Sequence, residues 1–289
     1  MAGRCSAGRQ AAQPLLVEQC PVSKSAVASL DGFQAGYADI AGVPTWHEVR
    51  GEGPALVLLH GGFSGAASWA AQAPALVAAG FRVHVPERRG HAHTPDVDGP
   101  LSYEVMAIDT AAYLEAEVAG PAHLVGWSDG AVVALLVALR RPDLVARLVL
   151  IGQYYNSSGR VPGSDLMRLL HTGEAKDFLR QGYDPLSPDG PAHFDVVYAK
   201  TMAMIDSEPE IDLAALSALS SPALVLQGDQ DEVTLEHSAA VAAALADGRL
   251  AVLPGTHLLP LEQPGLVNAL LVSFLQGSVP APSWVPSAG

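Results

Sequence analysis

The sequence predicts an α/β fold: a mostly parallel, eight-stranded sheet with helices on both faces and an inserted helical cap. Three observations lead to this prediction. Short apolar runs typical of buried strands alternate with helix-compatible segments along most of the 289 residues. Strands joined through helices run parallel and pack side by side. The alternation stops once, over residues 153–212, where helical patterns continue without a strand.

The elements begin at residue 34, and residues 1–33 are expected to be a mobile N-terminal extension. Residues 34–40 and 45–51 alternate in polarity around Gly42-Val43-Pro44, which predicts a hairpin of antiparallel edge strands. A continuous apolar run, typical of a strand covered on both faces, predicts a strand at residues 55–60. Five further strands are predicted at residues 81–86, 122–127, 145–152, 222–228 and 249–254. Helices are predicted at residues 66–79, 102–119, 131–140, 234–246 and 262–275.

The predicted core therefore comprises residues 34–152 and 213–276, and residues 277–289 form a C-terminal tail. Sixty residues are too many for a bare crossover, so residues 153–212 are interpreted as a helical cap. We expect the cap to cover the carboxyl edge of the sheet, because open α/β sheets bind their ligands there.

Composition narrows the classes of partner. The formal net charge is −14 and no basic cluster is present, which argues against binding to nucleic acid. The longest apolar run at the central motif covers residues 131–139, whereas a membrane span needs about twenty residues. The two cysteines, Cys5 and Cys20, precede the core, and the first thirty residues lack the apolar stretch of a secretion signal. A cytoplasmic location is the resulting expectation.

The motif Gly126-Trp127-Ser128-Asp129-Gly130 carries the main functional signal. A strand is predicted to end at its first glycine and a helix to begin at its second. A serine at such a tight strand-to-helix turn has an exposed hydroxyl beside the free N–H groups of the helix. Ser128 is therefore the candidate nucleophile, and the alternative is that it only caps the helix.

A serine nucleophile needs a base and an orienting acid, which on this kind of sheet follow it in the order acid, then histidine. His257 lies in the loop after the last predicted strand and is the candidate base. Asp231 lies after the preceding strand and is the preferred acid, with Asp229 as its main competitor. Gly62, after another strand, and Asp129 are expected to supply the backbone N–H groups of an oxyanion hole.

With these motifs and the loop "PERRGHAHTPD" (86–96), the chain resembles the α/β-hydrolase superfamily over about residues 34–276. "GWSDG" is similar to the biphenyl-hydrolase-like group of valacyclovirase-type serine hydrolases. The sequence departs from the family pattern in three places: Glu87 stands where aspartate is usual, and Ala92 and Ala131 stand where glycine is usual.

The resemblance implies a Ser–His–Asp triad, no cofactor, a small-molecule substrate and a cap above the site. In the biphenyl-hydrolase-like group it also implies that Asp129 pairs with a substrate amine. Phe63, Trp127 and Tyr154 are further candidate substrate-binding residues. The His91-x-His93 pair lacks further ligands in register, so no metal site is assigned.

From these features we predict a serine hydrolase that cleaves a small carboxylic ester. An aminoacyl ester is the substrate expected if Asp129 pairs with an amine. Lactones, amides and carbon–carbon bonds beside a ketone remain alternative substrates for the same triad. A binding or receptor protein that kept the fold and lost turnover is the alternative from another class. The oligomeric state is not determined by the sequence.

Overall fold

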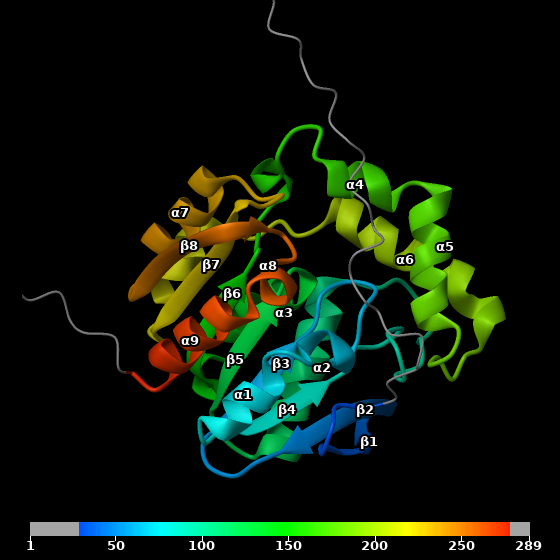
Figure 1. Cartoon of the computed structure of the whole chain (residues 1–289), viewed down its shortest axis with the longest axis horizontal. Helices are drawn as coiled ribbons and strands as arrows, with labels where there is room; N and C mark the ends of the chain where they lie inside the picture. Colours follow the sequence, from blue (N-terminus) through cyan, green and yellow to red (C-terminus); the bar gives the residue numbers. More distant parts are fainter. Residues whose placement is uncertain (1–28, 278–289) are drawn as a thin grey trace, which may run out of the picture.

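The computed structural model describes residues 29–277, and it confirms the predicted fold class (Figure 1). Within this range, one eight-stranded sheet has the order β1-β2-β4-β3-β5-β6-β7-β8. The strands are β1 (Gln34–Ile40), β2 (Val43–Arg50), β3 (Ala55–Leu59), β4 (Arg82–Pro86), β5 (Ala122–Trp127), β6 (Val145–Ile151), β7 (Ala223–Gln230) and β8 (Gly248–Thr256). Cys5, Cys20, most of the predicted extension and nearly all of the C-terminal tail lie outside the described residues.

The hairpin expected at the edge of the sheet is present, but of its two strands only β1 lies at the edge. β2 pairs antiparallel with β1 on one side and with β4 on the other, through His47–Arg50 against Val83–Pro86. From β4 to β8 all neighbouring strands are parallel. The carboxyl ends of these strands therefore meet at one edge of the sheet.

Helices cover both faces of the sheet and form two cores (Figure 1). Leu56 and Leu58 of β3 pack into one core, whereas Val57 and Leu59 pack into the other, as the period of a strand requires. The first core contains α1, α8 and α9, and the second contains α2, α3 and α7. The bounds of these helices are α1 (Ala73–Ala78), α2 (Tyr103–Tyr113), α3 (Asp129–Arg140), α7 (Leu235–Ala244), α8 (Leu259–Glu262) and α9 (Pro264–Leu275).

Three predicted helices are shorter or divided. Residues 66–79 form a 3-10 turn followed by α1, and the helix predicted at 262–275 begins as α9 only at Pro264, after the separate turn of α8. Proline lacks an N–H group and so favours the first turn of a helix. The helix predicted at 102–119 changes from α2 to a π-helical turn at Leu114–Val118 and ends at Ala119, whose φ is 57°.

The segment between β6 and β7 contains α4 (Asp165–Leu170), α5 (Gly173–Tyr183) and α6 (Phe194–Ser207), which lie to one side of the sheet (Figure 1). Asp96, in the loop after β4, joins this segment to the core: its carboxylate accepts from Lys200 Nζ at 2.6 Å and His193 Nε2 at 2.8 Å. Burial alone would raise the pKa of Asp96, but these hydrogen bonds outweigh it and lower the pKa. The predicted boundaries of the cap and core stay a prediction.

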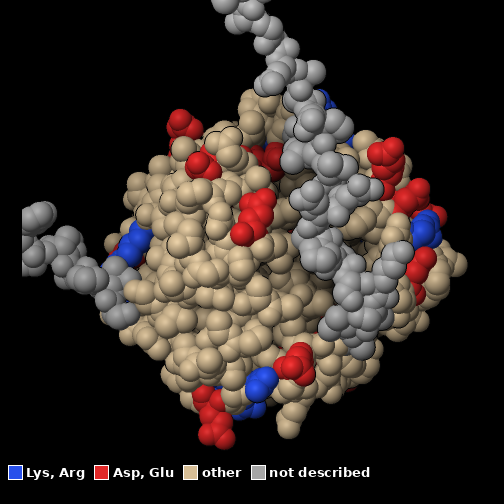
Figure 2. Space-filling view, in the orientation of Figure 1, with Lys and Arg blue, Asp and Glu red and all other residues tan. Residues whose placement is uncertain are grey.

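The surface is mixed in character. In the view of Figure 2, charged side chains lie mostly toward the rim, and the area over α1 and α9 is largely uncharged. This agrees with the sequence, where neither residues 61–81 nor residues 263–277 contain a charged side chain. No helix within residues 29–277 has the length and apolar character needed to cross a bilayer.

Two glycines set the distance between β5, β3 and the start of α3. A Cβ atom on Gly126 would overlap the carbonyl oxygen of Gly130, and one on Gly130 would overlap the carbonyl oxygens of Leu59 and His60. These neighbours are backbone atoms, which cannot rotate out of the way. The start of α3 therefore approaches the sheet more closely than any side chain would allow.

We predict that Gly130→Ala lowers the free energy of unfolding by about 3 kcal/mol, because the new methyl group forces the backbone of α3 away from β3. Urea unfolding measures the change. The matched control is Gly36→Ala in β1, where an added Cβ has no neighbour within 4 Å and the expected change is within about 0.5 kcal/mol. Equal stability of the two variants would contradict this account of the packing.

Candidate active site

Ser128 lies between β5 and α3 in a strained backbone conformation, with φ 55° and ψ −123°. A positive φ is rare for a residue with a side chain and occurs where the surroundings over-determine it. The amide of Ser128 donates to the Ile151 carbonyl at 2.8 Å, and Ala131 N donates to the Ser128 carbonyl at 2.8 Å. Its hydroxyl makes no capping bond to the helix, so the alternative of a simple cap is not supported.

The hydroxyl instead lies beside a histidine–aspartate pair. His257 Nε2 is 2.8 Å from Ser128 Oγ, and His257 Nδ1 is 2.7 Å from Asp231 Oδ1. Because a carboxylate only accepts hydrogen bonds, Nδ1 carries the proton and Nε2 is free to accept from the serine. The structure thus brings together the three side chains predicted as nucleophile, base and acid.

The competing aspartate is placed differently. Asp229 is exposed, and its Oδ1 accepts from Gly255 N at 3.0 Å, so it joins the ends of β7 and β8. Asp231 is buried, and its Oδ1 also accepts from Val233 N at 3.2 Å. Asp231 is therefore the acid that the fold directs at the imidazole.

Opposing effects act on the pKa of His257. Burial lowers this pKa, but the hydrogen bond and charge of Asp231, together with the charges of Asp129 and Glu232, outweigh burial and raise it. The imidazolium form is thus stabilised in a buried setting. A base that takes a proton during a reaction gains from such stabilisation.

Gly152, directly after β6, has no side chain and so leaves space for the His257 imidazole. Its φ is +59°, and a Cβ atom there would lie 2.9 Å from His257 Cε1 and 3.3 Å from Asp231 Oδ2. A side chain at this position would displace the pair. The sequence analysis did not single out Gly152, although a glycine as the last residue of a predicted strand is a detectable signal.

The loop after β3 places Gly62 beside the start of α3. A Cβ atom on Gly62 would lie 2.5 Å from Asp129 Oδ2 and 3.7 Å from Ile205 Cδ1 of α6. The residue must therefore be glycine if Asp129 keeps its place. The two backbone N–H groups predicted for an oxyanion hole thus belong to residues in direct contact.

Asp129 is a buried acid with only part of its hydrogen-bonding capacity used. Its Oδ1 accepts from the Tyr103 hydroxyl at 2.8 Å, whereas Oδ2 is buried and has no hydrogen-bond partner among the described residues. Burial raises the pKa of Asp129, and the charge of Arg88 and the Tyr103 bond oppose that rise. Tyr103 was missed by the sequence analysis, because nothing near residue 103 indicates a contact with residue 129.

The other candidate substrate-binding residues divide into two groups. Phe63 is half-buried with its ring centroid 5.6 Å from that of Tyr198 in α6, and the Tyr154 hydroxyl is 3.5 Å from that of Tyr103. Phe63 therefore lies against α6, and Tyr154 lies close to Tyr103, the hydrogen-bond partner of Asp129. Trp127 does not face the site.

The Trp127 indole is buried and packs edge-to-face on Trp69 in the core. Its Nε1 donates to the His257 carbonyl at 2.8 Å. Trp127 is thus placed to hold the loop of His257, which corrects the expected contact with substrate.

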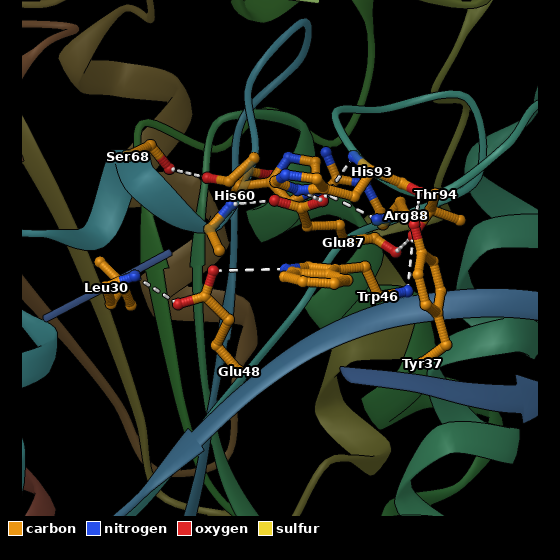
Figure 3. Close-up of polar contacts among 12 residues, drawn as sticks. Leu30, Tyr37, Trp46, Glu48, His60, Ser68, Glu87, Arg88, His93 and Thr94 are labelled. Atoms are coloured by element: carbon orange, nitrogen blue, oxygen red, sulfur yellow. Dashed lines mark hydrogen bonds and ion pairs between the residues drawn. The ribbon is translucent and has the colours of Figure 1, made fainter. Parts of the chain in front are cut away.

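The loop after β4 is tied to the core by Glu87 (Figure 3). The buried Glu87 carboxylate accepts from Ala66 N at 2.9 Å and from His93 N at 2.8 Å. His91 instead bonds the Arg89 carbonyl through Nδ1 at 2.9 Å, and burial lowers the pKa of His91 to about 3. The two histidines of the His-x-His pair thus have separate partners, and no cluster within residues 29–277 could hold a metal ion.

A family model identifies the protein family to which this chain is related. Residues 56–270, well over half of the chain, match the family model described as the alpha/beta hydrolase family. The chain belongs to the alpha/beta hydrolase family. The resemblance to this superfamily inferred from the sequence is thereby confirmed.

Individual relatives of this alpha/beta hydrolase have several named activities. It is 30% identical over 247 residues to the pyrrolizixenacetamide deacetylase of Xenorhabdus hominickii, covering 78% of this chain and 92% of the relative. A thermophilic esterase from Thermogutta terrifontis matches with a TM-score of 0.67 and 25% identity, over 84% and 98% of the two chains. The meta-cleavage product hydrolase of Pseudomonas fluorescens matches with a TM-score of 0.66 and 22% identity, over 85% and 98%, which shows the shared fold.

We predict that Asp231→Asn lowers the pKa of His257, because burial then acts without the aspartate that opposes it. Titration of the imidazole by NMR measures the pKa directly. Asp229→Asn is the matched control, since Asp229 bonds Gly255 and not the imidazole. If both substitutions shift the His257 titration equally, the pairing of Asp231 with His257 is not what sets that pKa.

Proposed function

We propose that this alpha/beta hydrolase is a cofactor-independent serine hydrolase that cleaves a small carboxylic ester through an acyl-enzyme. The observation that carries the proposal is the relay from Ser128 Oγ to His257 Nε2 at 2.8 Å and from Nδ1 to Asp231 at 2.7 Å. A hydroxyl at pH 7 becomes nucleophilic when such a base lies within hydrogen-bond distance.

The reaction follows from this geometry. Ser128 Oγ attacks the ester carbonyl, and its proton passes to His257 Nε2. His257 then gives that proton to the departing alkoxide, which leaves as an alcohol with the acyl group on Ser128. Water attacks the acyl-enzyme, losing a proton to His257, which returns it to Ser128 as the acid leaves. Asp231 holds the ring and stabilises the imidazolium in both halves.

The negative charge on the carbonyl oxygen needs donors. The N–H groups of Gly62 and Asp129 come from residues whose atoms are in contact at the start of α3. One such donor is typically worth about 3–4 kcal/mol of barrier stabilisation. A free N–H at a helix start also lies at the positive end of the helix dipole.

Asp129 favours an aminoacyl ester as the substrate. Its Oδ2 is buried without a partner among the described residues, and a buried carboxylate oxygen in that state is costly. A substrate ammonium group would supply both the missing hydrogen bond and the opposite charge. Because Asp129 contacts Gly62, an ammonium group bound to Asp129 would lie close to the reacting carbonyl, as in an α-amino ester, and this supports the proposal.

An amide or other acyl compound is the second candidate, favoured by the relative that is named a deacetylase. The same steps apply with an amine as the leaving group. A hydrolysis screen with aminoacyl esters, neutral esters, anilides and lactones ranks these classes. The proposal expects esters to be cleaved fastest.

We predict that a fluorophosphonate labels the protein with one adduct, on Ser128, and that Ser128→Ala abolishes it. His257→Ala should slow labelling by roughly 100-fold or more, since a general base contributes about that much. Peptide mass spectrometry locates the adduct, and Ser68→Ala is the control for loss of a serine. A folded protein that remains unlabelled from pH 6 to 9 would favour a binding protein without turnover.

We predict that Asp129→Asn lowers kcat/KM for an aminoacyl ester by roughly 10-fold or more relative to a neutral ester of equal length. A hydrogen bond to a charged group is worth about 1.5–3 kcal/mol, which sets this magnitude. The neutral ester is the internal control, because Asp129 keeps its backbone N–H in the variant. An unchanged ratio would remove Asp129 from substrate recognition.

A further inference from the structure

The guanidinium of Arg88 is buried against the loop that carries Gly62, and the steps above give it no role. Arg88 follows β4 and is 6% exposed. Its Nη1 donates to the His60 carbonyl and its Nη2 to the Gly61 carbonyl at 3.0 Å (Figure 3 shows Arg88 beside His60). Within residues 29–277 no carboxylate oxygen lies within 4.0 Å of its guanidinium nitrogens.

Burial of this charge is costly, so its position needs an explanation. Burial lowers the pKa of Arg88 to about 10, although the negative charge of Asp129 opposes this shift. The side chain thus stays a cation at neutral pH. An apolar side chain would fill this space at a lower energetic cost, so the contacts of the cation with the two backbone carbonyls call for an explanation.

Three donors converge on the Gly61 carbonyl oxygen. Besides Arg88 Nη2, His60 Nδ1 donates at 2.7 Å and Ser64 Oγ at 2.9 Å. The tautomer of His60 is fixed, because its Nε2 accepts from Arg88 N at 3.1 Å and the proton must therefore lie on Nδ1. The Gly61 carbonyl is thus held from three sides, by two side chains of its own loop and by Arg88 from the loop after β4.

The orientation of the Gly61 carbonyl determines that of the Gly62 amide. The peptide bond between them is planar and trans, so the C=O and the N–H lie in one plane and point in opposite directions. Two consecutive glycines would otherwise leave this plane free to rotate. Donors on the carbonyl also polarise the amide and make its N–H a stronger donor.

We propose that Arg88 is a positioning residue that aims and polarises the Gly62 N–H toward the carbonyl oxygen of the substrate. This role rests on the proposed function. The cation also offsets Asp129, whose Oδ2 lies 2.5 Å from where a Cβ on Gly62 would be and would oppose negative charge on that oxygen. Arg88 thus supports the transition state without touching the substrate.

A purely structural Arg88 makes a different prediction. Loss of a structural contact changes stability and weakens the binding of substrate and transition state alike. If the Gly62 N–H instead loses its orientation, kcat falls with little change in KM. The reason is that this N–H bonds strongly only to the substrate oxygen that becomes negatively charged in the transition state. The affinity for a boronic acid, which forms a tetrahedral adduct with serine, should fall by the same factor as kcat.

The chain provides a matched pair of serines for the test. Ser64 Oγ donates to the Gly61 carbonyl at 2.9 Å, and Ser68 Oγ donates to the Gly65 carbonyl at 2.8 Å, so each serine bonds the carbonyl three residues earlier in the segment between β3 and α1. Both are half-buried. Only the Gly61 carbonyl belongs to the peptide that carries the Gly62 N–H.

We predict that Ser64→Ala lowers kcat and the affinity for phenylboronic acid by roughly 3- to 10-fold, whereas Ser68→Ala changes neither. Arg88→Met should lower both by roughly 100-fold, the loss typical of one oxyanion donor. Arg88→Lys should be intermediate, because lysine keeps the charge but cannot contact both carbonyls through a planar fork. KM and the affinity for the product acid should stay within about twofold of the parent.

The outcomes separate the two proposals. If the parent protein is labelled on Ser128 but Ser64→Ala equals Ser68→Ala, or the Arg88 variants lose KM and kcat together, the role of Arg88 is overturned. If the parent is neither labelled nor active, the proposed function fails, and this role fails with it. Ser64→Ala keeps the test decisive even if Arg88→Met does not fold.

Discussion

The backbone of Ser128 is held at φ 55° by the close packing of β5 and α3 against β3, and the other parts of the site are arranged around that point. Such a conformation costs about 1–3 kcal/mol and persists only where its neighbours over-determine it. Residues 131–135 of α3 are completely buried, and Gly126 and Gly130 allow the helix to reach the sheet. Burial of the helix thus offsets the strain at the serine.

The same packing determines which loops can meet the hydroxyl. Parallel strands deliver the loops after β3, β6, β7 and β8 to one edge of the sheet. Small residues then let the side chains approach, since Gly152 leaves space for His257 and Gly62 leaves space for Asp129. The positions of the charged side chains in the site therefore depend on these glycines, because any larger residue there would displace His257 or Asp129.

Much of this was predictable from the sequence, because the signals are local. Strand runs, the Gly126–Gly130 motif and the order of Asp231 and His257 each depend on near neighbours along the chain, and a rule for parallel sheets connects them. The preference for Asp231 over Asp229 as the partner of His257 agrees with the hydrogen bonds in the structure.

The remainder depends on contacts between distant residues. Tyr103 bonds Asp129 across 26 positions, and Arg88 bonds Gly61 across 27, which no periodicity or motif spacing encodes. The orientation of Trp127 followed from core packing against Trp69, so its place beside Ser128 in the sequence misled the prediction. Two predicted helices are divided where prolines, which lack an N–H group, begin a new helix. The prediction missed these divisions because it used hydrophobic periodicity, which does not depend on the backbone N–H.

The proposed reaction requires that Ser128 carries a covalent acyl group during turnover. Rapid-quench kinetics with a chromogenic ester, combined with intact-protein mass spectrometry, tests it most directly. We expect a burst of alcohol release of up to one equivalent per active site, together with a mass increase equal to the acyl group and located on Ser128. Hydrolysis that proceeds without a burst, and without an adduct even when deacylation is slowed, would contradict it.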